Sequence, residues 1–345
     1  MKLYLSHESA LQFYRSRQPD RTIAGKRHLI PNSHIPSLKL AEAVWLQEKF
    51  DIATPVCAEV AIENNRRRNS TLTCSIQPSG LAKWGYFHLG RSLYVAPPEL
   101  ALAQIAGALV DGRIMPDCEW ESEATAKRFA VIALAVLGSE LAANYVLNDE
   151  SEDGLDECPP ALSLKDLDAL LDGSGPFHGK RVLQQARQFM VDNAKSPTEI
   201  ELALFASLPT FFGGAGLPKP VLNKRVSVAY GENTLTRDPD LLFEGSSVVL
   251  EYNGGRHEGE RADADDERRN ELIDSGYEIL VVNKKQLQDA ELLENIFSTA
   301  AKKTGRKGRY AADYAARRED LRGIVFGLLG TGCKDSLTKG LPLAR

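Results

Sequence analysis

The sequence predicts an α/β protein in which a C-terminal mixed sheet flanked by helices follows a smaller α+β N-terminal domain. Its 345 residues are 43% hydrophobic and 26% charged, which is enough apolar material for two packed cores. Between residues 196 and 292 the patterns occur in the order helix, three strands, helix, strand, helix. The strand-helix-strand section predicts two parallel neighbouring strands, so that the sheet is mixed.

The domain boundaries are predicted from changes in composition along the chain. Residues 148–162, which begin NDESEDGLDECPP, are acidic and poor in apolar residues, as is typical of a linker. The predicted order is an N-terminal domain (1–147), this linker, a pair of connecting helices (163–195), a second domain (196–298) and a basic helical tail (299–345). In the N-terminal domain, helical spacing covers 9–17, 98–110 and 123–146, and strand-like runs cover 71–76 and 92–95.

Each element of the second domain has a local signal. Ser196, Pro197 and Glu199 have the spacing of a capping box with proline at the first helical position, and an apolar helix over 200–208 follows. After a glycine- and proline-rich loop (211–220), strands are predicted over 224–229 and, as a hairpin with its turn at 244–246, over 238–253. A polar helix (263–274) ends at Gly276, a strand (277–282) comes next, and a last helix begins near Lys285.

Composition bears on the cellular setting and on the partners. The five cysteines lack CxxC spacing, so neither a zinc knuckle nor a disulfide framework is indicated. The N-terminus lacks the apolar core of a signal peptide and no stretch approaches the length of a bilayer span, so we expect a cytoplasmic protein without a membrane partner.

The formal net charge of −5 gives no general attraction to nucleic acid, which local basic patches would have to supply. Two segments qualify, although each also fits a solvated face. One is residues 66–68; the other contains Lys302, Lys303, Arg306, Lys307 and Arg309 and continues through Arg317, Arg318 and Arg322.

The most informative position is Glu251, which directly follows the apolar run Val248-Val249-Leu250 of a strand buried on both faces. A buried carboxylate without a partner costs several kcal/mol, so we expect a cation beside it. Asp240 begins the partner strand of the predicted hairpin, which brings the two carboxylates together. They would supply the oxygen ligands that Mg²⁺ or Mn²⁺ prefers, and a zinc site is not expected without cysteine. The alternative is that Arg268 or Arg269 from the following helix neutralises both.

Three further residues are candidates for the same site. Glu199 is explained by helix capping, but it would also reach the carboxylate pair if the helix end lies over it. Asn253 lies two residues beyond Glu251 on the same strand face and can bind water or a phosphate oxygen without adding positive charge. His257 follows two glycines and can act as an acid or base, or can be an ordinary loop histidine.

These motifs, taken in order, resemble the PD-(D/E)XK nuclease superfamily, and within it the branch of the very-short-patch-repair endonuclease. The motifs are SPTE (196–199), DLLF (240–243), EYNGGRH (251–257) and DDERRNELIDSGYEILVV (265–282). The resemblance implies a restriction-endonuclease-like sheet, Glu199, Asp240 and Glu251 as the acidic positions, and Mg²⁺-dependent phosphodiesterase activity. It also implies that Asp265 and residues 268–270 brace the site or meet phosphate. Asn253 departs from the lysine of the superfamily and the aspartate of the branch.

The N-terminal segments YLSHESALQFYR and YVAPPELALAQIAGALV are similar to segments of proteins related to abortive-infection antitoxin regulators. We therefore expect a regulatory or partner-binding N-terminal domain. The leading hypothesis is a Mg²⁺-dependent nuclease that hydrolyses DNA in bacterial defence or a toxin–antitoxin system. The alternative is a non-catalytic DNA-binding regulator or antitoxin-like interaction protein with the same fold. In the first case Asp240 and Glu251 bind the metal and Glu199, Asn253 and His257 assist. The residues expected to hold the nucleic-acid backbone are Arg268, Arg269, Lys302, Lys303, Arg306, Lys307 and Arg309.

Overall fold

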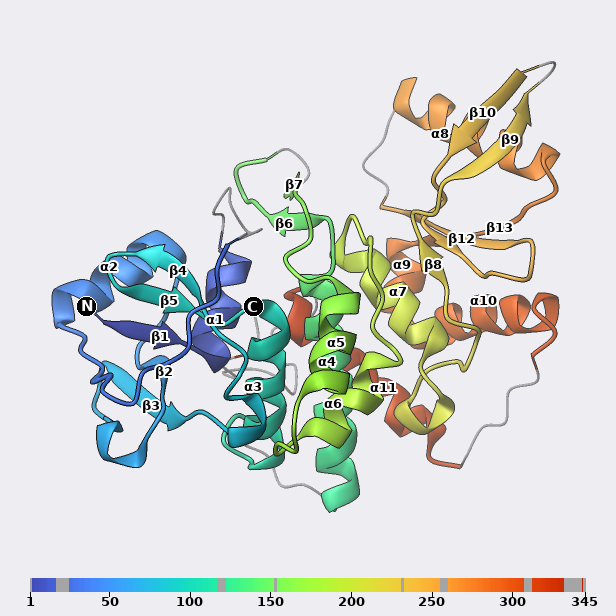
Figure 1. The fold of residues 1–345 in the computed structure, drawn as a ribbon. Coiled ribbons are helices and arrows are strands. Elements are labelled where there is room, and N and C mark those ends of the chain that lie inside the picture. Colours follow the sequence, from blue (N-terminus) through green and yellow to red (C-terminus); the bar gives the residue numbers. More distant parts are fainter. Residues whose placement is uncertain are drawn as a thin grey trace. The chain divides into compact units, whose positions relative to one another are not determined.

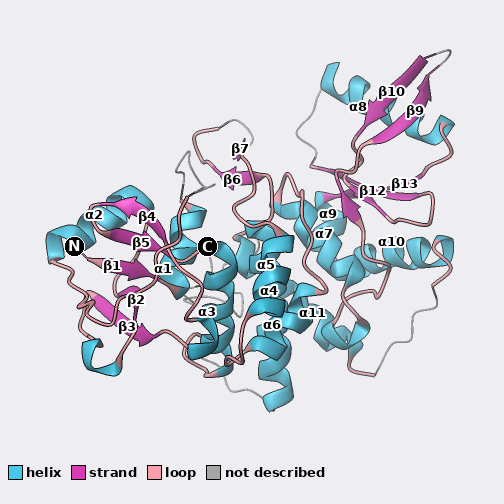
Figure 2. Ribbon diagram, viewed as in Figure 1, coloured by secondary structure: helices cyan, strands magenta, loops and turns pink. Residues whose placement is uncertain are grey.

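The computed structural model describes residues 2–16, 25–116, 122–151, 154–230, 233–254, 260–306, 312–331 and 343. The chain divides into two compact units, which are drawn in Figures 1 and 2. Unit 1 is Met1–Gln188 with Thr338–Arg345, and unit 2 is Phe189–Leu337. Both units combine helices with sheets that contain parallel and antiparallel pairs, so the predicted α/β class is confirmed. In the described part of the chain, none of the helices has the length and apolar character that crossing a membrane requires.

A five-stranded mixed sheet forms one layer of unit 1, in the order β3-β2-β1-β5-β4. Its strands β1 and β5 run parallel, as do β2 and β3, whereas β1 and β2 are antiparallel. The short strands β1 and β5 are almost wholly apolar, which explains their central position. The five strands are β1 (Leu3–Leu5), β2 (Val56–Val60), β3 (Leu72–Ile76), β4 (Phe87–Gly90) and β5 (Leu93–Val95).

Helices pack beside this sheet and against one another (Figure 1). α1 contacts β2 and α3, and α3 in turn contacts α4, α5 and α6. Nearly every residue of α3 is buried, and α4 is buried from Phe129 onward, so these two helices form the centre of the helical layer. The helices of unit 1 are α1 (His7–Arg15), α2 (Leu40–Phe50), α3 (Pro98–Val110), α4 (Glu123–Leu141), α5 (Leu164–Gly173) and α6 (Lys180–Arg187).

The acidic stretch 148–162, predicted as a linker between domains, lies within unit 1. Strands β6 (Tyr145–Leu147) and β7 (Leu155–Glu157) pair as an antiparallel hairpin around its first part, and the whole stretch lies inside unit 1. The helices α5 and α6, predicted as connectors, also belong to unit 1, because the leucines of α5 and Leu183 of α6 are buried there. The boundary between the units falls after Gln188.

Unit 2 contains a four-stranded mixed sheet, in the order β13-β12-β11-β8, and a separate hairpin of β9 and β10. β12 pairs in parallel with β13 over six residues, which is the predicted relation of the two strands around the polar helix. Leu272 of that helix packs with apolar side chains of the hairpin and the sheet. The strands are β8 (Val221–Leu222), β9 (Val226–Tyr230), β10 (Asn233–Arg237), β11 (Leu241–Leu242), β12 (Val248–Asn253) and β13 (Glu278–Asn283).

Helices flank the unit 2 sheet (Figure 2): α8 contacts β9 and β13, and α9 and α10 also contact β13. The tail predicted from residue 299 onward belongs to this unit as far as Leu337. Its helix α11 contacts α7, where the ring centroids of Phe326 and Phe205 are 5.4 Å apart. The helices are α7 (Pro197–Ser207), α8 (Glu260–Asp274), α9 (Lys284–Gln288), α10 (Ala290–Lys303) and α11 (Tyr314–Leu329).

Candidate functional site

The register of β11 and β12 brings Asp240 and Glu251 together. Leu241 lies opposite Leu250, so Asp240, immediately before β11, lies opposite Glu251 on the antiparallel partner. The backbone N–H of Asp240 donates to Glu251 Oε1 at 3.3 Å, and the N–H of Tyr252 donates to Asp240 Oδ2 at 2.8 Å. Each carboxylate is therefore held by the backbone of the opposite strand, and the two side chains share one end of the sheet.

Arg268 on α8 contacts both carboxylates. Its Nη2 lies 2.9 Å from Glu251 Oε2 and 3.7 Å from Asp240 Oδ1. The arrangement is the alternative stated for the sequence, in which an arginine of the following helix neutralises the buried acids. Arg269, its neighbour, acts at longer range, since its charge lowers the pKa of Asp240.

Burial makes the carboxylate pair difficult to ionise. Glu251 is 5% exposed, and its burial, together with the negative charge of Asp240, raises its pKa to about 7. Arg268 opposes both effects without cancelling them. Burial likewise raises the pKa of Asp240, although the Tyr252 N–H and the Arg268 charge oppose the rise. Burial is thus the main reason why both carboxylates resist ionisation.

Glu199 has the capping role and also lies near the pair. Ser196 Oγ accepts from the Glu199 N–H at 3.3 Å and donates to Glu199 Oε1 at 3.0 Å, while the Lys195 N–H donates to Oε2 at 2.9 Å. Burial raises the pKa of Glu199 to about 7, and the charge of Asp240 contributes to this rise. Capping and proximity to the site are thus both present, and they do not exclude each other.

Asn223 is a component of the site that the sequence motifs did not reveal. Its Nδ2 donates to Glu199 Oε2 at 2.5 Å and to the Asn193 carbonyl at 2.9 Å, and its N–H donates to the Asp240 carbonyl at 3.1 Å. It therefore joins the start of α7 to the strand that carries Asp240. Its φ of 48° lies in the left-handed region, which asparagine tolerates better than most residues. The only local sign of this role in the sequence is that Asn223 directly follows the apolar pair Val221-Leu222.

The remaining predicted residues lie at or beyond the end of β12. Asn253 closes the strand, opposite Asn283 of β13, and its half-buried side chain is on the same strand face as Glu251. His257 lies outside the described residues, as do Lys307 and Arg309, and the side chain of Asp265 is not described. The geometry of the site is therefore described without His257.

The donor set of the site fits a hard divalent cation. Within the described residues, no group of three or more His, Cys, Asp or Glu side chains is placed to hold a metal ion, so Glu199 does not complete a ready-made metal cage. Asp240 and Glu251 supply carboxylate oxygens only, and Mg²⁺ typically binds one or two carboxylates and keeps several waters. Burial raises the pKa of both carboxylates and so disfavours their charged form, and a bound cation would offset that cost.

The basic segment divides into exposed and structural residues. Lys302 and Arg306 are exposed, and Lys303 forms an ion pair with Glu278. Farther along, Arg322 is only 6% exposed and donates to the carbonyls of Leu287 and Gln288 at 2.9 and 2.6 Å. The expectation that the whole segment up to Arg322 holds a nucleic-acid backbone is therefore wrong for Arg322, whose side chain is committed to the fold.

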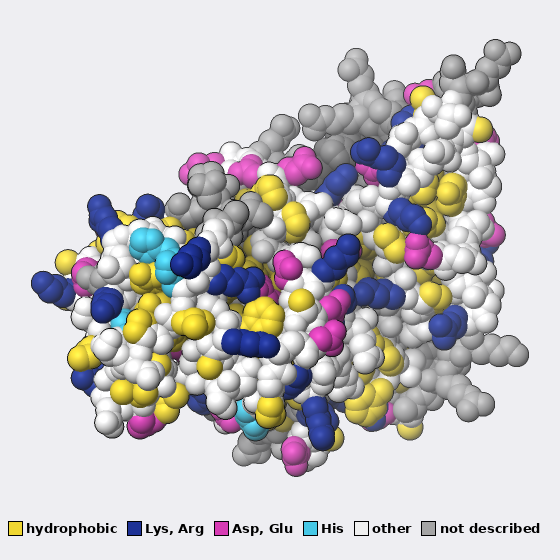
Figure 3. All heavy atoms as spheres, viewed as in Figure 1, with side chains coloured by type: hydrophobic (Ala, Val, Ile, Leu, Met, Phe, Trp, Pro, Cys, Tyr) yellow, Lys and Arg dark blue, Asp and Glu magenta, His cyan; other side chains and the backbone are white. Residues whose placement is uncertain are grey.

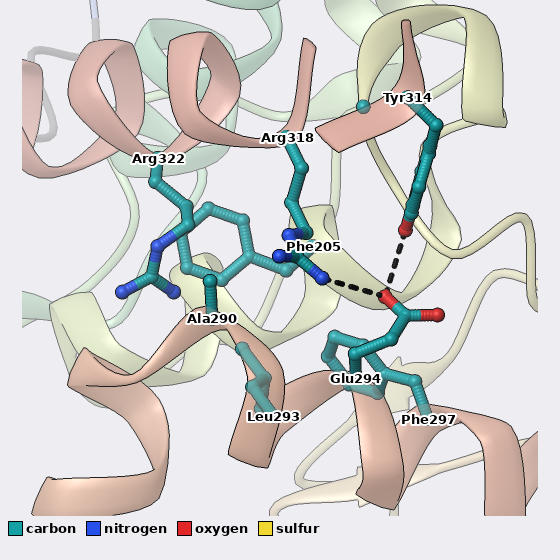
Figure 4. A pocket seen from close by; sticks show the side chains of 9 residues that line it. Phe205, Ala290, Leu293, Glu294, Phe297, Tyr314, Arg318 and Arg322 are labelled. Carbon is teal, nitrogen blue, oxygen red and sulfur yellow. Dashed lines mark hydrogen bonds and ion pairs between the residues drawn. The ribbon is translucent and has the colours of Figure 1, made fainter. Parts of the chain in front are cut away.

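Figure 4 shows the surroundings of two arginines of α11, Arg318 and Arg322. Arg318 points from α11 toward Glu294 of α10, at 3.7 Å, and Tyr314 donates to the same carboxylate at 2.8 Å. The Arg322 guanidinium lies over the Phe205 ring of α7, 5.7 Å from its centroid. These contacts bind α7, α10 and α11 together around a void of about 10 Å³, the size of one water.

On the face drawn in Figure 3, basic side chains are interspersed with acidic ones along the described surface. Comparisons of the sequence and the structure with models of protein families, with curated proteins and with solved structures found no match.

Proposed function

We propose that unit 2 is a Mg²⁺-dependent nuclease that hydrolyses phosphodiester bonds of DNA, built on the restriction-endonuclease-like arrangement that its motifs resemble. The observation that carries this proposal is the meeting of Asp240 and Glu251 at one end of the β11–β12 pair, with Arg268 as their direct cationic contact. A buried carboxylate beside a half-buried one is costly unless a cation is bound there. The same cation would suit phosphate chemistry, because its positive charge also attracts a phosphate group.

In this proposal Asp240 and Glu251 hold the metal ion, and Mn²⁺ can replace Mg²⁺. The ion, when bound, would lower the pKa of a water and stabilise negative charge on the phosphate. The Tyr252 N–H and the Asp240 N–H orient the two carboxylates by the hydrogen bonds described above. The Arg268 side chain is 35% exposed, so its outer side can contact a phosphate oxygen.

Glu199 is a candidate for handling a proton at this site. Its pKa of about 7 means that it is partly protonated near neutral pH and can accept or donate a proton there. Asn223 holds its Oε2 and so positions it. Asn253 contributes a polar amide in place of the positive charge that the superfamily has, so positive charge comes from Arg268, which contacts both carboxylates, and at longer range from Lys195 and Arg269. The exposed Lys302 and Arg306 are candidates for contacts with the DNA backbone.

The test is cleavage of supercoiled plasmid and of single-stranded DNA in the presence of Mg²⁺, Mn²⁺ or EDTA. We expect cleavage that requires the divalent ion and is abolished by Glu251→Gln and Asp240→Asn. Asp274→Asn is the matched control, because Asp274 is an exposed acid at the end of the same helix that carries Arg268. Activity that survives Glu251→Gln would refute the assignment, as would equal losses in the control.

A second function is favoured by two observations. Arg268 already neutralises part of the negative charge of the two carboxylates. Asn253 adds no positive charge that could hold a phosphate. These features suit a non-catalytic regulator that keeps the nuclease fold and binds DNA, or an antitoxin-like protein whose unit 1 binds a protein partner. Salt-dependent DNA binding without divalent-dependent cleavage would identify the regulator. Absence of DNA binding together with a stable protein complex would identify the interaction protein.

A further inference from the structure

Unit 1 contains a cavity of about 680 Å³, lined by residues that are distant in sequence from Asp240 and Glu251. The end of α3, the first turns of α4 and the loop that leads into α6 form its walls, and α6 contacts both other helices. Its volume lies in the range of sites that bind small organic molecules, about 300–1,000 Å³.

One wall of the cavity is apolar. Leu109 and Val110 at the end of α3, Ala126 and Ala130 of α4, and Val182 of α6 contribute to it. Val110 is 43% exposed, which is high for a large aliphatic side chain in a helix that is otherwise almost entirely buried. An apolar body bound here would cover that surface and gain the free energy of removing it from water.

The remaining wall carries an excess of positive charge. Lys127, Lys180 and Arg181 line the cavity, and Glu123 is the acid among the lining residues, in a chain whose net charge is −5. Lys180 donates to the Ser174 carbonyl at 2.9 Å and so has no acidic partner in that contact. Lys127 and Arg181 are exposed, and within the described residues neither forms a hydrogen bond or an ion pair. Their charge is available to a ligand.

One part of the cavity wall is closely packed, where the loop before α6 meets α3. A Cβ on Gly179 would lie 2.5–2.7 Å from backbone atoms of Ala106 and Gly107, which shows how closely the loop before α6 lies against α3. His178 Nε2 and Asp111 Oδ1, 3.0 Å apart, connect the same loop to the end of α3. A preformed wall reduces the ordering that a ligand would have to impose.

We propose that this cavity binds a small amphipathic organic anion, with its carboxylate or phosphate between Lys127 and Arg181 and its apolar body against Val110, Ala130 and Val182. The ligand class follows from the juxtaposition of an exposed apolar wall with two cations that have no partner among the described residues. A neutral apolar molecule would leave the cations unused, and an inorganic anion would leave the wall exposed. The proposal concerns unit 1 alone and does not depend on the nuclease assignment of unit 2.

The test uses three probes of equal chain length: decanoate, decanol and decylammonium. Each is titrated by calorimetry into the full-length protein below its micelle concentration. We expect decanoate to bind at least tenfold more tightly than decanol and decylammonium not to bind. The double variant Lys127→Gln/Arg181→Gln should weaken decanoate binding at least tenfold and leave decanol binding unchanged. Lys165→Gln, which removes an exposed cation of α5 in the same unit, is the matched control and should bind like the wild type.

A second variant tests the cavity without changing its charge. Ala126→Phe places a ring in the cavity from a half-buried position on α4 and should abolish binding of decanoate and decanol alike. Far-UV circular dichroism and tryptophan fluorescence establish that each variant is folded. No decanoate binding by the wild type, or binding that neither the double variant nor Ala126→Phe weakens, would overturn the proposal.

Discussion

Replacement of Arg268 by methionine should destabilise unit 2, because it leaves the buried Glu251 and the half-buried Asp240 without their direct cationic contact. Removing one partner of a fully buried ion pair costs about 3–5 kcal/mol, and an exposed pair contributes about 0–1 kcal/mol. Glu251 is 6% exposed in its side chain and Arg268 is 35% exposed, so the pair is intermediate between these cases. We therefore expect the free energy of unfolding to fall by about 2 kcal/mol. Methionine is the chosen replacement because it keeps most of the apolar stem of arginine.

Hydrogen exchange followed by mass spectrometry is the suitable assay, since it resolves peptides of each unit. A loss of about 2 kcal/mol corresponds to about 30-fold faster exchange of the β12 amides, provided that they exchange by unfolding of unit 2. Tryptophan fluorescence is an internal reference, because the described tryptophans, Trp45 and Trp84, lie in unit 1. Lys302→Met, which removes an exposed cation of α10, is the matched control and should leave β12 exchange unchanged.

Magnesium extends the same experiment to the proposed metal site. If Asp240 and Glu251 bind the ion, Mg²⁺ at tenfold its dissociation constant stabilises the folded unit by about 1.4 kcal/mol. The effect should be larger in Arg268→Met than in the wild type, because the guanidinium no longer competes with the ion for the carboxylates. Unchanged β12 exchange in the variant would refute the stabilising role of Arg268. Equal effects of Mg²⁺ on Arg268→Met and Lys302→Met would refute its competition with the metal.

Three further predictions test other contacts. Asn223→Ala removes the donor to Glu199 Oε2, and we expect hydrogen exchange at the start of α7 to show a loss of about 1–2 kcal/mol, whereas an unchanged α7 would contradict the linking role of Asn223. Glu201 is buried, and burial raises its pKa from 4.5 to about 8, so the folded state retains a proton that the unfolded state releases. The free energy of unfolding should therefore fall by up to about 1.4 kcal/mol per pH unit between pH 4.5 and 8. Denaturant titrations at several pH values should show this dependence, and Glu201→Gln should flatten it. Arg322→Met should lower the stability of unit 2 without changing DNA affinity in a salt titration; a reduced salt slope with unchanged stability would reverse this assignment.

Several elements were predictable from the sequence because their signals are local. Helix α3 has the predicted bounds 98–110, since proline at its first position and a continuous apolar run act within a few residues. The capping geometry of Ser196 and Glu199 and the position of Glu251 at the end of an apolar strand have the same origin. By contrast, β11 has only two residues, and β8 and β10 were not predicted. The two-residue strands β8 and β11 exist because a neighbouring strand pairs with them, which no local pattern records.

The amino-acid sequence by itself determined the α/β class, the hairpin that places Asp240 opposite Glu251, and the absence of cysteine from that hairpin. Only the tertiary structure decided that Arg268 contacts both acids, that Asn223 connects Glu199 to Asp240, and that Arg322 is buried. The physical reason is the range of the interactions. Hydrogen bonding within a turn of helix or across a tight hairpin depends on adjacent residues, whereas the partner of a charged side chain depends on how distant helices pack.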